Sequence, residues 1–268
     1  MATNVQSIGT GVSETWLSFR FELLKHLKRR RLFIVAGLAI VIPLLFYSYY
    51  YKQHPTAASD FASTSLTLMN ILVLISAAMF AGDAICSEFE KKTSLLLFST
   101  PQKRSSIFAG KFVAALMATF LVVSLYYLVL TLQIGQLFGW GNVPAELGKS
   151  FAAALIYSAA AVSIVFFVSS ILKRSMSATI VGLLVLLMIL PIIVMIITLL
   201  NHEPWYIVTY SAGLITSVLG GSSGFGPGEH GDVMRQFTPT FAKGVAVMVA
   251  YAVVALAAGM RIAVRKED

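Results

Sequence analysis

Three short stretches of this chain match, by their letters alone, motifs that bind phosphate or carry a nucleophile. Residues 226–231 fit the G-x-G-x-x-G pattern of dinucleotide sites, and residues 220–224 fit the G-x-S-x-G pattern of serine hydrolases. Both patterns function where a strand meets a helix, whereas these two lie in one glycine-rich loop. Residues 148–150 read Gly-Lys-Ser, but Val143 occupies the position at which a phosphate-binding loop needs its first glycine. We therefore expect no catalytic residue and no cofactor-binding site.

Metal ligands do not cluster in the sequence either. The four histidines are His26, His54, His202 and His230. None forms the close pair of a helical metal site, and Cys86 has no second cysteine with which to share a metal ion or a disulfide. A metal held by His202 and His230 in one loop is conceivable, but solvated loop polarity is the simpler interpretation. We expect no metal site.

The composition of the 268-residue chain is that of a membrane protein. Hydrophobic residues make up 57% and charged residues 12%, which is about half the charge of an average soluble protein. A soluble fold of this size has too few interior positions for so many apolar side chains, so the excess must face lipid. Soluble enzymes, disordered chains and secreted disulfide scaffolds are excluded together.

Six uncharged runs are long enough to cross a bilayer as helices, which need about 20 apolar residues each. These runs are 32–51, 65–82, 112–132, 151–172, 178–200 and 244–260. A seventh apolar stretch, 205–220, is too short, so we expect a re-entrant or interfacial hairpin between the fifth and sixth helices. The expected fold is an all-α membrane protein with a cytoplasmic segment at 1–31, a six-helix domain at 32–268 and an outer loop at about 201–243.

The distribution of basic residues orients these helices. Sixteen of the 20 lysines and arginines fall on the N-terminal segment, the second and fourth connections and the C-terminus. The other side holds four, which are Lys52, Lys149, Arg235 and Lys243. Because lysine and arginine concentrate on the cytoplasmic side of membranes, we expect both termini in the cytoplasm of a multi-pass plasma-membrane protein. The net charge of +8 follows from this topology and requires no nucleic-acid partner.

The segment before the first span, residues 13–31, has the pattern of an amphipathic helix. Glu22 and the basic residues fall on a polar face, opposite an apolar one. The apolar face carries Trp16, Leu17, Phe21 and Leu24. Such a helix lies in the inner headgroup layer of the bilayer, with its aromatic side chains toward lipid. The alternative is a plain topology signal, which needs only the basic cluster at 28–31.

The six predicted spans contain no charged residue. Proton- and ion-coupled transporters place an ionisable group at mid-membrane, and Asp83, at the inner end of the second span, comes nearest to that position. A channel or a transporter powered by a separate protein therefore fits better than a secondary transporter. An intramembrane lipid-modifying enzyme is the weakest hypothesis for the same reason.

The connection at about 87–111, between the second and third spans, combines charge, an apolar helix and a stop. Glu88 and Glu90 precede Thr93, which has the properties of an N-cap for a helix of about two turns. This helix would contain Leu95, Leu96, Leu97 and Phe98 and would end before Pro101. Four consecutive apolar residues on a cytoplasmic loop need a partner, which is either the membrane surface or another protein.

This combination resembles the type 2 membrane permeases of ATP-binding-cassette (ABC) transporters. In that family an acidic end of the second helix, a Gly-Thr, a short Leu-Leu coupling helix, a proline, a basic residue and a Gly-Lys recur in order. The corresponding residues here are Glu88, Glu90, Thr93, Leu95, Leu96, Leu97, Pro101, Arg104, Gly110 and Lys111. The amphipathic helix, the six spans and the hairpin match as well, so the resemblance covers nearly the whole chain. Lys92 departs from it, because the family has glycine before the threonine.

The resemblance implies a permease subunit without a motor of its own. It would pair with a second permease, an identical copy in the simplest case, and with two cytoplasmic ATPases that hold ATP and Mg²⁺. The coupling helix would dock in a cleft of the ATPase, and the implied function is ATP-driven transport, most simply export. The alternative is a non-transporting membrane anchor or assembly subunit that docks another cytoplasmic partner. The residues expected to make the ATPase contact are the apolar Leu96, Leu97 and Phe98 and the basic Arg104, with the acidic Glu88 and Glu90 as positioning contacts.

Overall fold

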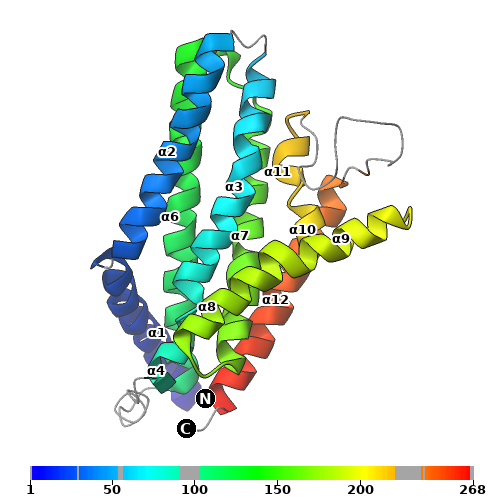
Figure 1. The fold of residues 1–268 in the computed structure, drawn as a ribbon. Helices are drawn as coiled ribbons and strands as arrows, with labels where there is room; N and C mark the ends of the chain where they lie inside the picture. The colour runs from blue at the N-terminus through cyan, green and yellow to red at the C-terminus, as the bar shows by residue number, and fades with distance from the viewer. Residues whose placement is uncertain are drawn as a thin grey trace.

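The computed structural model describes residues 2–28, 30–53, 57–90, 103–220, 237 and 239–265. Within these ranges the chain is almost entirely helical and contains no strand, as the uncharged runs predict. The long helices stand side by side as a tall bundle, from which two segments lean away at an angle (Figure 1).

Six of the described helical segments are long and apolar enough to cross a membrane. In chain order they are α2 (Arg30–Gln53), α3 (Ala58–Ala81) continued by α4 (Cys86–Glu90), α6 (Arg104–Phe138), α7 (Glu146–Ile171), α8 (Ser175–Leu184) continued by η2 (Val185–Ile189) and α9 (Leu190–Leu199), and α12 (Phe241–Arg265). The six predicted spans are therefore confirmed. Each helical segment begins earlier than its uncharged run, because backbone hydrogen bonding continues where the side chains become polar.

The centre of the bundle is formed by α3, α6 and α7, which are the most buried of the six spans. Small residues such as Ala77, Ala115 and Ala161 are fully buried there and allow the helix backbones to approach closely. By contrast, α2, α8 with α9, and α12 expose most of their apolar side chains. These outer helices present the surfaces on which lipid or another protein can pack.

The fifth span is bent away from the others, and Figure 1 shows it leaning outward from α8 to α9. Its middle is the π-helical turn η2, and Pro191 stands in the first turn of α9. Proline has no N–H to donate to the carbonyl four residues earlier, so the regular helix is interrupted near it. The departure of this helix from the bundle thus has a local cause in the sequence.

The stretch 205–220 forms two single-turn helices, α10 (Val208–Ser211) and α11 (Leu214–Ser217), instead of a seventh span. Their residues are buried against the neighbouring helices. The prediction that this stretch is too short to cross is confirmed, while its depth in a bilayer stays a prediction. A short 3₁₀ helix, η1 (Trp140–Asn142), joins α6 to α7.

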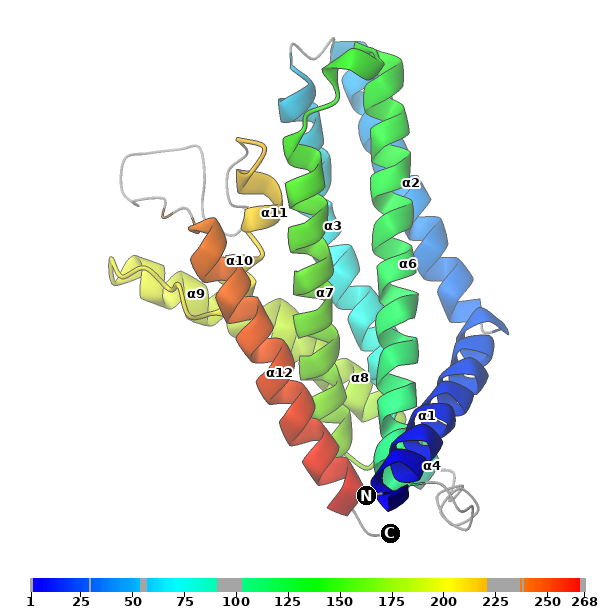
Figure 2. The same cartoon turned by 180° about the vertical axis from the view of Figure 1, so that it is seen from behind.

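The N-terminal helix α1 (Ala2–Lys28) packs obliquely on the first turns of α6, as Figure 2 shows from behind. The helix, α4 and the C-terminal end of α12 all lie at the same end of the bundle, which we call the α4 end. Basic residues concentrate on the segments that meet there, so the positive-inside rule predicts that the α4 end faces the cytoplasm.

Candidate functional site

The residues predicted to meet a partner fall partly inside and partly outside the described ranges. Glu88 and Glu90 lie on α4, and Arg104 is the first residue of α6. The other residues of the predicted coupling helix lie outside the described residues: they are Thr93, Leu95, Leu96, Leu97, Phe98 and Pro101. We call residues 91–102 the coupling segment. The structure describes the residues on either side of it, and the helix predicted within it stays a prediction.

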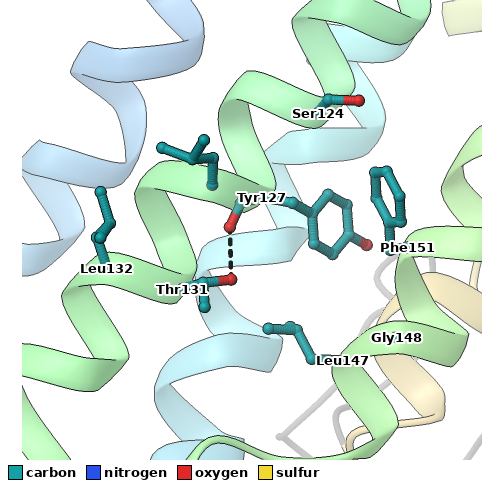
Figure 3. Close-up of a pocket in the computed structure, with 8 residues that line it drawn as sticks. Ser124, Tyr127, Thr131, Leu132, Leu147, Gly148 and Phe151 are labelled. Atoms are coloured by element: carbon teal, nitrogen blue, oxygen red, sulfur yellow. Dashed lines mark hydrogen bonds between the residues drawn. The ribbon is translucent and has the colours of Figure 1, made fainter. Parts of the chain in front are cut away.

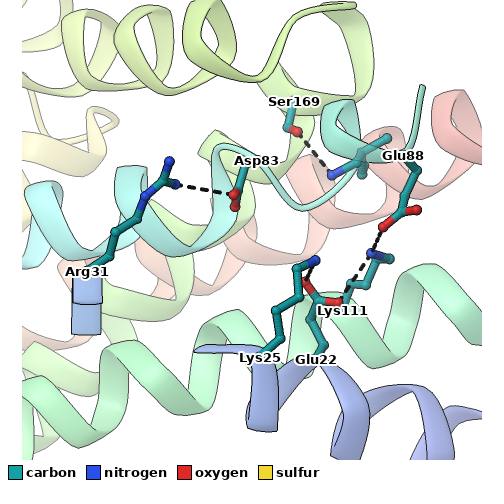
Figure 4. A network of polar contacts seen from close by, with 8 residues as sticks. Glu22, Lys25, Arg31, Asp83, Glu88, Lys111 and Ser169 are labelled. Atoms are coloured by element: carbon teal, nitrogen blue, oxygen red, sulfur yellow. Dashed lines mark hydrogen bonds and ion pairs between the residues drawn. The ribbon is translucent and has the colours of Figure 1, made fainter. Parts of the chain in front are cut away.

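The central feature of the α4 end is a buried lysine, Lys111, in the second turn of α6. Its side chain is 5% exposed, and its ammonium Nζ lies 2.7 Å from Glu88 Oε1 and 3.4 Å from Glu22 Oε2. On α1, Lys25 Nζ lies 2.6 Å from the other oxygen of Glu22. Figure 4 shows the four side chains converging from α1, α4 and α6. One buried cation thus joins three helices, and we call Lys111, Glu22 and Glu88 the Lys111 cluster.

The charges of the cluster stabilise one another. Burial by itself would raise the pKa of Glu22, but the nearby positive charges, chiefly Lys111 and Lys25, outweigh it and hold that pKa below its ordinary value of 4.5. Glu22 is therefore ionised at neutral pH. Because a buried charge is costly without a partner, each member of the cluster depends on the others.

The close approach of α1 to α6 is made possible by Gly110. A Cβ atom at this position would lie 2.6 Å from Ser18 Cβ and 2.8 Å from the backbone nitrogen of Phe19, distances that real side chains do not reach. The Gly-Lys pair therefore has two functions in one turn. Gly110 leaves room for α1, and Lys111 binds it by charge.

A second ion pair lies beside the cluster. Arg31 Nη1, near the start of α2, donates to Asp83 Oδ2 at 3.2 Å (Figure 4). The Asp83 side chain is 7% exposed and lies in the turn between α3 and α4. Its partner identifies Asp83 as a contact between the first and second spans, which is a simpler role than the proton relay that its position in the sequence suggested.

Both attachment points of the coupling segment are held by named contacts. On the outgoing side, Glu90 Oε2 accepts a hydrogen bond of 2.9 Å from the backbone N–H of Ser175, the first residue of α8. On the returning side, the backbone N–H of Lys103 donates to Glu14 Oε2 at 3.2 Å, and Arg104 Nη1 reaches the carbonyl of Val264 at 3.5 Å. Glu88 and Glu90 thus make contacts within this chain, and their part in binding an ATPase stays a prediction.

Cys86 anchors the start of α4 to the end of α7. Its thiol Sγ donates to the carbonyl of Ser169 at 2.9 Å and lies 3.0 Å from the carbonyl of Leu172. The Ser169 hydroxyl in turn accepts the backbone N–H groups of Ile85 and Cys86, at 3.3 and 3.4 Å. The cysteine is buried, and its position is explained by these contacts without any redox role.

The amphipathic character of α1 is confirmed, with one difference from a simple interfacial helix. The apolar residues point away from the protein: Trp16, Leu17, Phe21 and Leu24 are all exposed. Part of the opposite face, with Glu22 and His26, is buried against the bundle. The polar side of α1 therefore binds the transmembrane helices, while the apolar side is free to meet lipid.

At the other end of the bundle, a shallow pocket of about 420 Å³ lies between α6 and α7 (Figure 3). Its lining is mainly apolar, and the polar groups of Tyr127 and Thr131 are engaged in hydrogen bonds within the chain. Tyr126 and Tyr157 are fully buried in the core nearby. These aromatic side chains therefore belong to the packed interior of the bundle.

Metal-binding groups do not gather in the described part of the chain, where no set of three His, Cys, Asp or Glu residues is close enough to hold an ion. The Glu203 carboxylate accepts a hydrogen bond of 3.3 Å from Tyr210. His230, the second histidine of the conceivable loop site, lies outside the described residues.

These features define an all-α, multi-pass membrane protein. It has six candidate spans, a helix α1 with an exposed apolar face, and buried ion pairs at the α4 end. A family model described as "ABC-2 family transporter protein" matches residues 16–267. The chain therefore belongs to the ABC-2 transporter family, in which it is a membrane-spanning component distinct from the ATPase.

One stretch of the chain is also similar to a bacterial protein. It is 35% identical over 78 residues to the uncharacterized membrane protein YdbK of Bacillus subtilis strain 168. The aligned stretch covers 29% of this chain and 31% of YdbK.

Sequence reasoning found the Gly110-Lys111 pair only as part of a resemblance and missed the partners of Lys111. The available signal was local: a glycine and a lysine directly before a long apolar run, and one acidic residue, Glu22, among the basic residues of an amphipathic helix. Neither signal says that these residues meet, because they are 89 positions apart in the chain.

Proposed function

We propose that this chain is the permease subunit of an ABC transporter, and that it moves its substrate out of the cell. In this proposal two copies pair in the membrane, and each binds one cytoplasmic ATPase through the segment between α4 and α6. ATP and Mg²⁺ belong to the ATPase, so this chain supplies no catalytic group.

The observation that carries the proposal is the arrangement of the α4 end within a member of this family. The segment that begins after Glu90 and returns at Lys103 is attached to α8, α1 and α12 at its two ends. A force applied to that segment by a partner would therefore reach several helices at once. Nucleotide-driven closure of the partner can then bias the bundle between two states through contacts that differ between those states.

The apolar side chains of the predicted coupling helix support the same interpretation. Leu95, Leu96, Leu97 and Phe98 provide a short hydrophobic plug, and Arg104 adds a positive charge beside it. Apolar anchors surrounded by charged residues are typical of protein contacts. A lipid surface is the alternative partner for these side chains.

The test is co-purification from the native host. A C-terminally tagged chain is solubilised gently, and the bound proteins are identified beside a Leu96→Asp, Leu97→Asp double variant. A matched control, Leu96→Met, Leu97→Met, keeps the apolar volume. We expect an ATPase in about one-to-one ratio with the wild type and the control, and its loss from the Asp variant, because buried charge opposes the apolar contact.

Two results would contradict the proposal. If no ATPase accompanies the wild type, the chain is a membrane anchor or assembly subunit instead of a permease. If the Asp variant keeps the ATPase, the coupling helix is assigned wrongly, although the permease function can stand.

A further inference from the structure

The Lys111 cluster connects two parts of the protein that have different surroundings. Glu22 belongs to α1, whose apolar face is exposed, and Glu88 belongs to α4, two residues before Glu90, after which the coupling segment begins. Lys111 contacts both, at 3.4 and 2.7 Å, and is 5% exposed. Water competes poorly with ion pairs that are so deeply buried, so both contacts persist together.

Packing makes the same connection independently of charge. The missing side chain at Gly110 lets the backbone of α1 lie against α6, with Ser18, Phe19 and Thr15 at the contact. The returning end of the coupling segment is bound to α1 as well, because Glu14 accepts the N–H of Lys103. Both ends of the segment are thus joined to α1, one through Lys111 and one directly.

We propose that Lys111 is a positioning residue that makes α1 and the coupling segment a single moving unit. When a partner displaces the coupling segment, α1 is displaced with it, and its exposed Trp16 and Phe21 move relative to the lipid. The inference rests on the proposed function for the source of the displacement. The connection among α1, α4 and α6 itself depends on the ion pairs of Lys111 with Glu22 and Glu88.

The variants remove different contacts of the Lys111 cluster. Glu22→Leu removes the ion pair between α1 and Lys111 but keeps the Lys111–Glu88 pair, so the chain retains a paired lysine and is expected to fold. Lys111→Met removes both ion pairs, and Lys111→Arg keeps a cation at the same position. Lys25→Gln is the matched control, because Lys25 contacts the same carboxylate from within α1 and, among the described residues, pairs with no other helix.

The first measurement is hydrogen–deuterium exchange of the full chain purified alone. We expect the amides of residues 13–28 to exchange about tenfold faster in Glu22→Leu and Lys111→Met than in the wild type, Lys111→Arg and Lys25→Gln. Equal exchange in all five proteins would contradict the proposal that Lys111 holds α1 in place. This arm needs no ATPase, so its result does not depend on the proposed function.

The second measurement follows the response to nucleotide in the complex with the co-purified ATPase, without nucleotide and with ATP and vanadate. In the wild type we expect exchange to change in both 86–104 and 13–28. In Glu22→Leu we expect the change in 86–104 to remain and the change in 13–28 to be clearly smaller than in the wild type, and in Lys111→Arg we expect both changes. A role in folding alone would not separate the two segments in this way.

The outcomes distinguish the two proposals. If 13–28 responds to nucleotide in Glu22→Leu as it does in the wild type, the transmission through Lys111 is wrong while the permease function stands. If neither segment responds in the wild type complex, the source of the displacement is wrong, and with it the transmission to α1.

Discussion

The two ends of the bundle hold their helices together with different polar chemistry. At the α4 end, the charged Lys111 joins α6 to α1 and α4. At the opposite end, the hydroxyl of Tyr127 on α6 lies 2.7 Å from Ser150 Oγ on α7, which donates to the carbonyl of Ile215 on α11 at 2.6 Å. Since Ser150 has one proton to give, Tyr127 is the donor in the first of these bonds.

The difference shows what each joint can do. Buried charges interact strongly and become very costly when one partner is removed, whereas neutral hydroxyls contribute modestly and leave a smaller penalty. The ion pairs of Lys111 lie where the coupling segment leaves α4 and returns to α6. Under the proposed function, this is the place that a partner would displace. The neutral joint fixes the hairpin between the fifth and sixth spans to the bundle.

The largest effect is expected from Lys111→Met. The substitution leaves Glu22 and Glu88 buried without their common cation, which should destabilise the folded protein by about 3–5 kcal/mol. Thermal unfolding of the purified protein in one detergent measures the change. If Lys111→Met costs no more stability than loss of the contact between Tyr127 and Ser150, the ion pairs of the cluster stabilise the protein less than their burial indicates.

A compensating variant sharpens this prediction. Combining Lys111→Met with Glu22→Leu and Glu88→Leu removes every charge of the cluster together, and we expect much of the lost stability to return, because apolar replacements of buried ion pairs are often neutral. If the triple variant is less stable than Lys111→Met, the loss comes from packing around the Lys111 stem instead of unpaired charge.

A smaller effect is expected from Ser150→Ala at the neutral joint. The change removes the hydroxyl that contacts the Tyr127 hydroxyl and the Ile215 carbonyl, with an expected cost of about 1–3 kcal/mol. The same unfolding measurement applies, with Ser158→Ala as the control, since within the described part of the chain Ser158 donates to a carbonyl of its own helix and to no other. A cost equal to that of Lys111→Met would remove the distinction between the two ends.

The smallest effect is expected from pH, through Glu22. Its pKa is lower in the folded protein than in the unfolded chain, so the stabilisation is present above the ordinary value of 4.5 and is lost as pH falls through the lowered folded pKa. Lys111, Lys25 and His26 are the positive charges that face it. We expect the melting temperature to fall more between about pH 7 and about pH 3.5 in the wild type than in Glu22→Leu.

A parallel loss in both proteins would assign the acid sensitivity to other carboxylates. The comparison uses the single Glu22 variant so that Glu88 and Lys111 are present in both proteins.

Much of this architecture follows from patterns that are local in the chain. Uncharged runs of about 20 residues predict spanning helices because the bilayer has a fixed thickness, and all six are present. The periodicity around Trp16 and Phe21 predicts an amphipathic helix, and both residues are exposed on α1. In the fifth span, the π-helical turn lies just before Pro191, so this interruption also has a local cause, although the uncharged run does not predict it.

What the sequence by itself determined is therefore the number of spans and the amphipathic helix before the first of them. The tertiary structure alone decided that Lys111 meets Glu22 and Glu88, and that Ser150 meets Tyr127 and Ile215. The physical reason is the range of the interactions. Span length and helix periodicity depend on neighbouring residues, whereas a buried ion pair depends on how distant helices pack, and no local pattern records that arrangement.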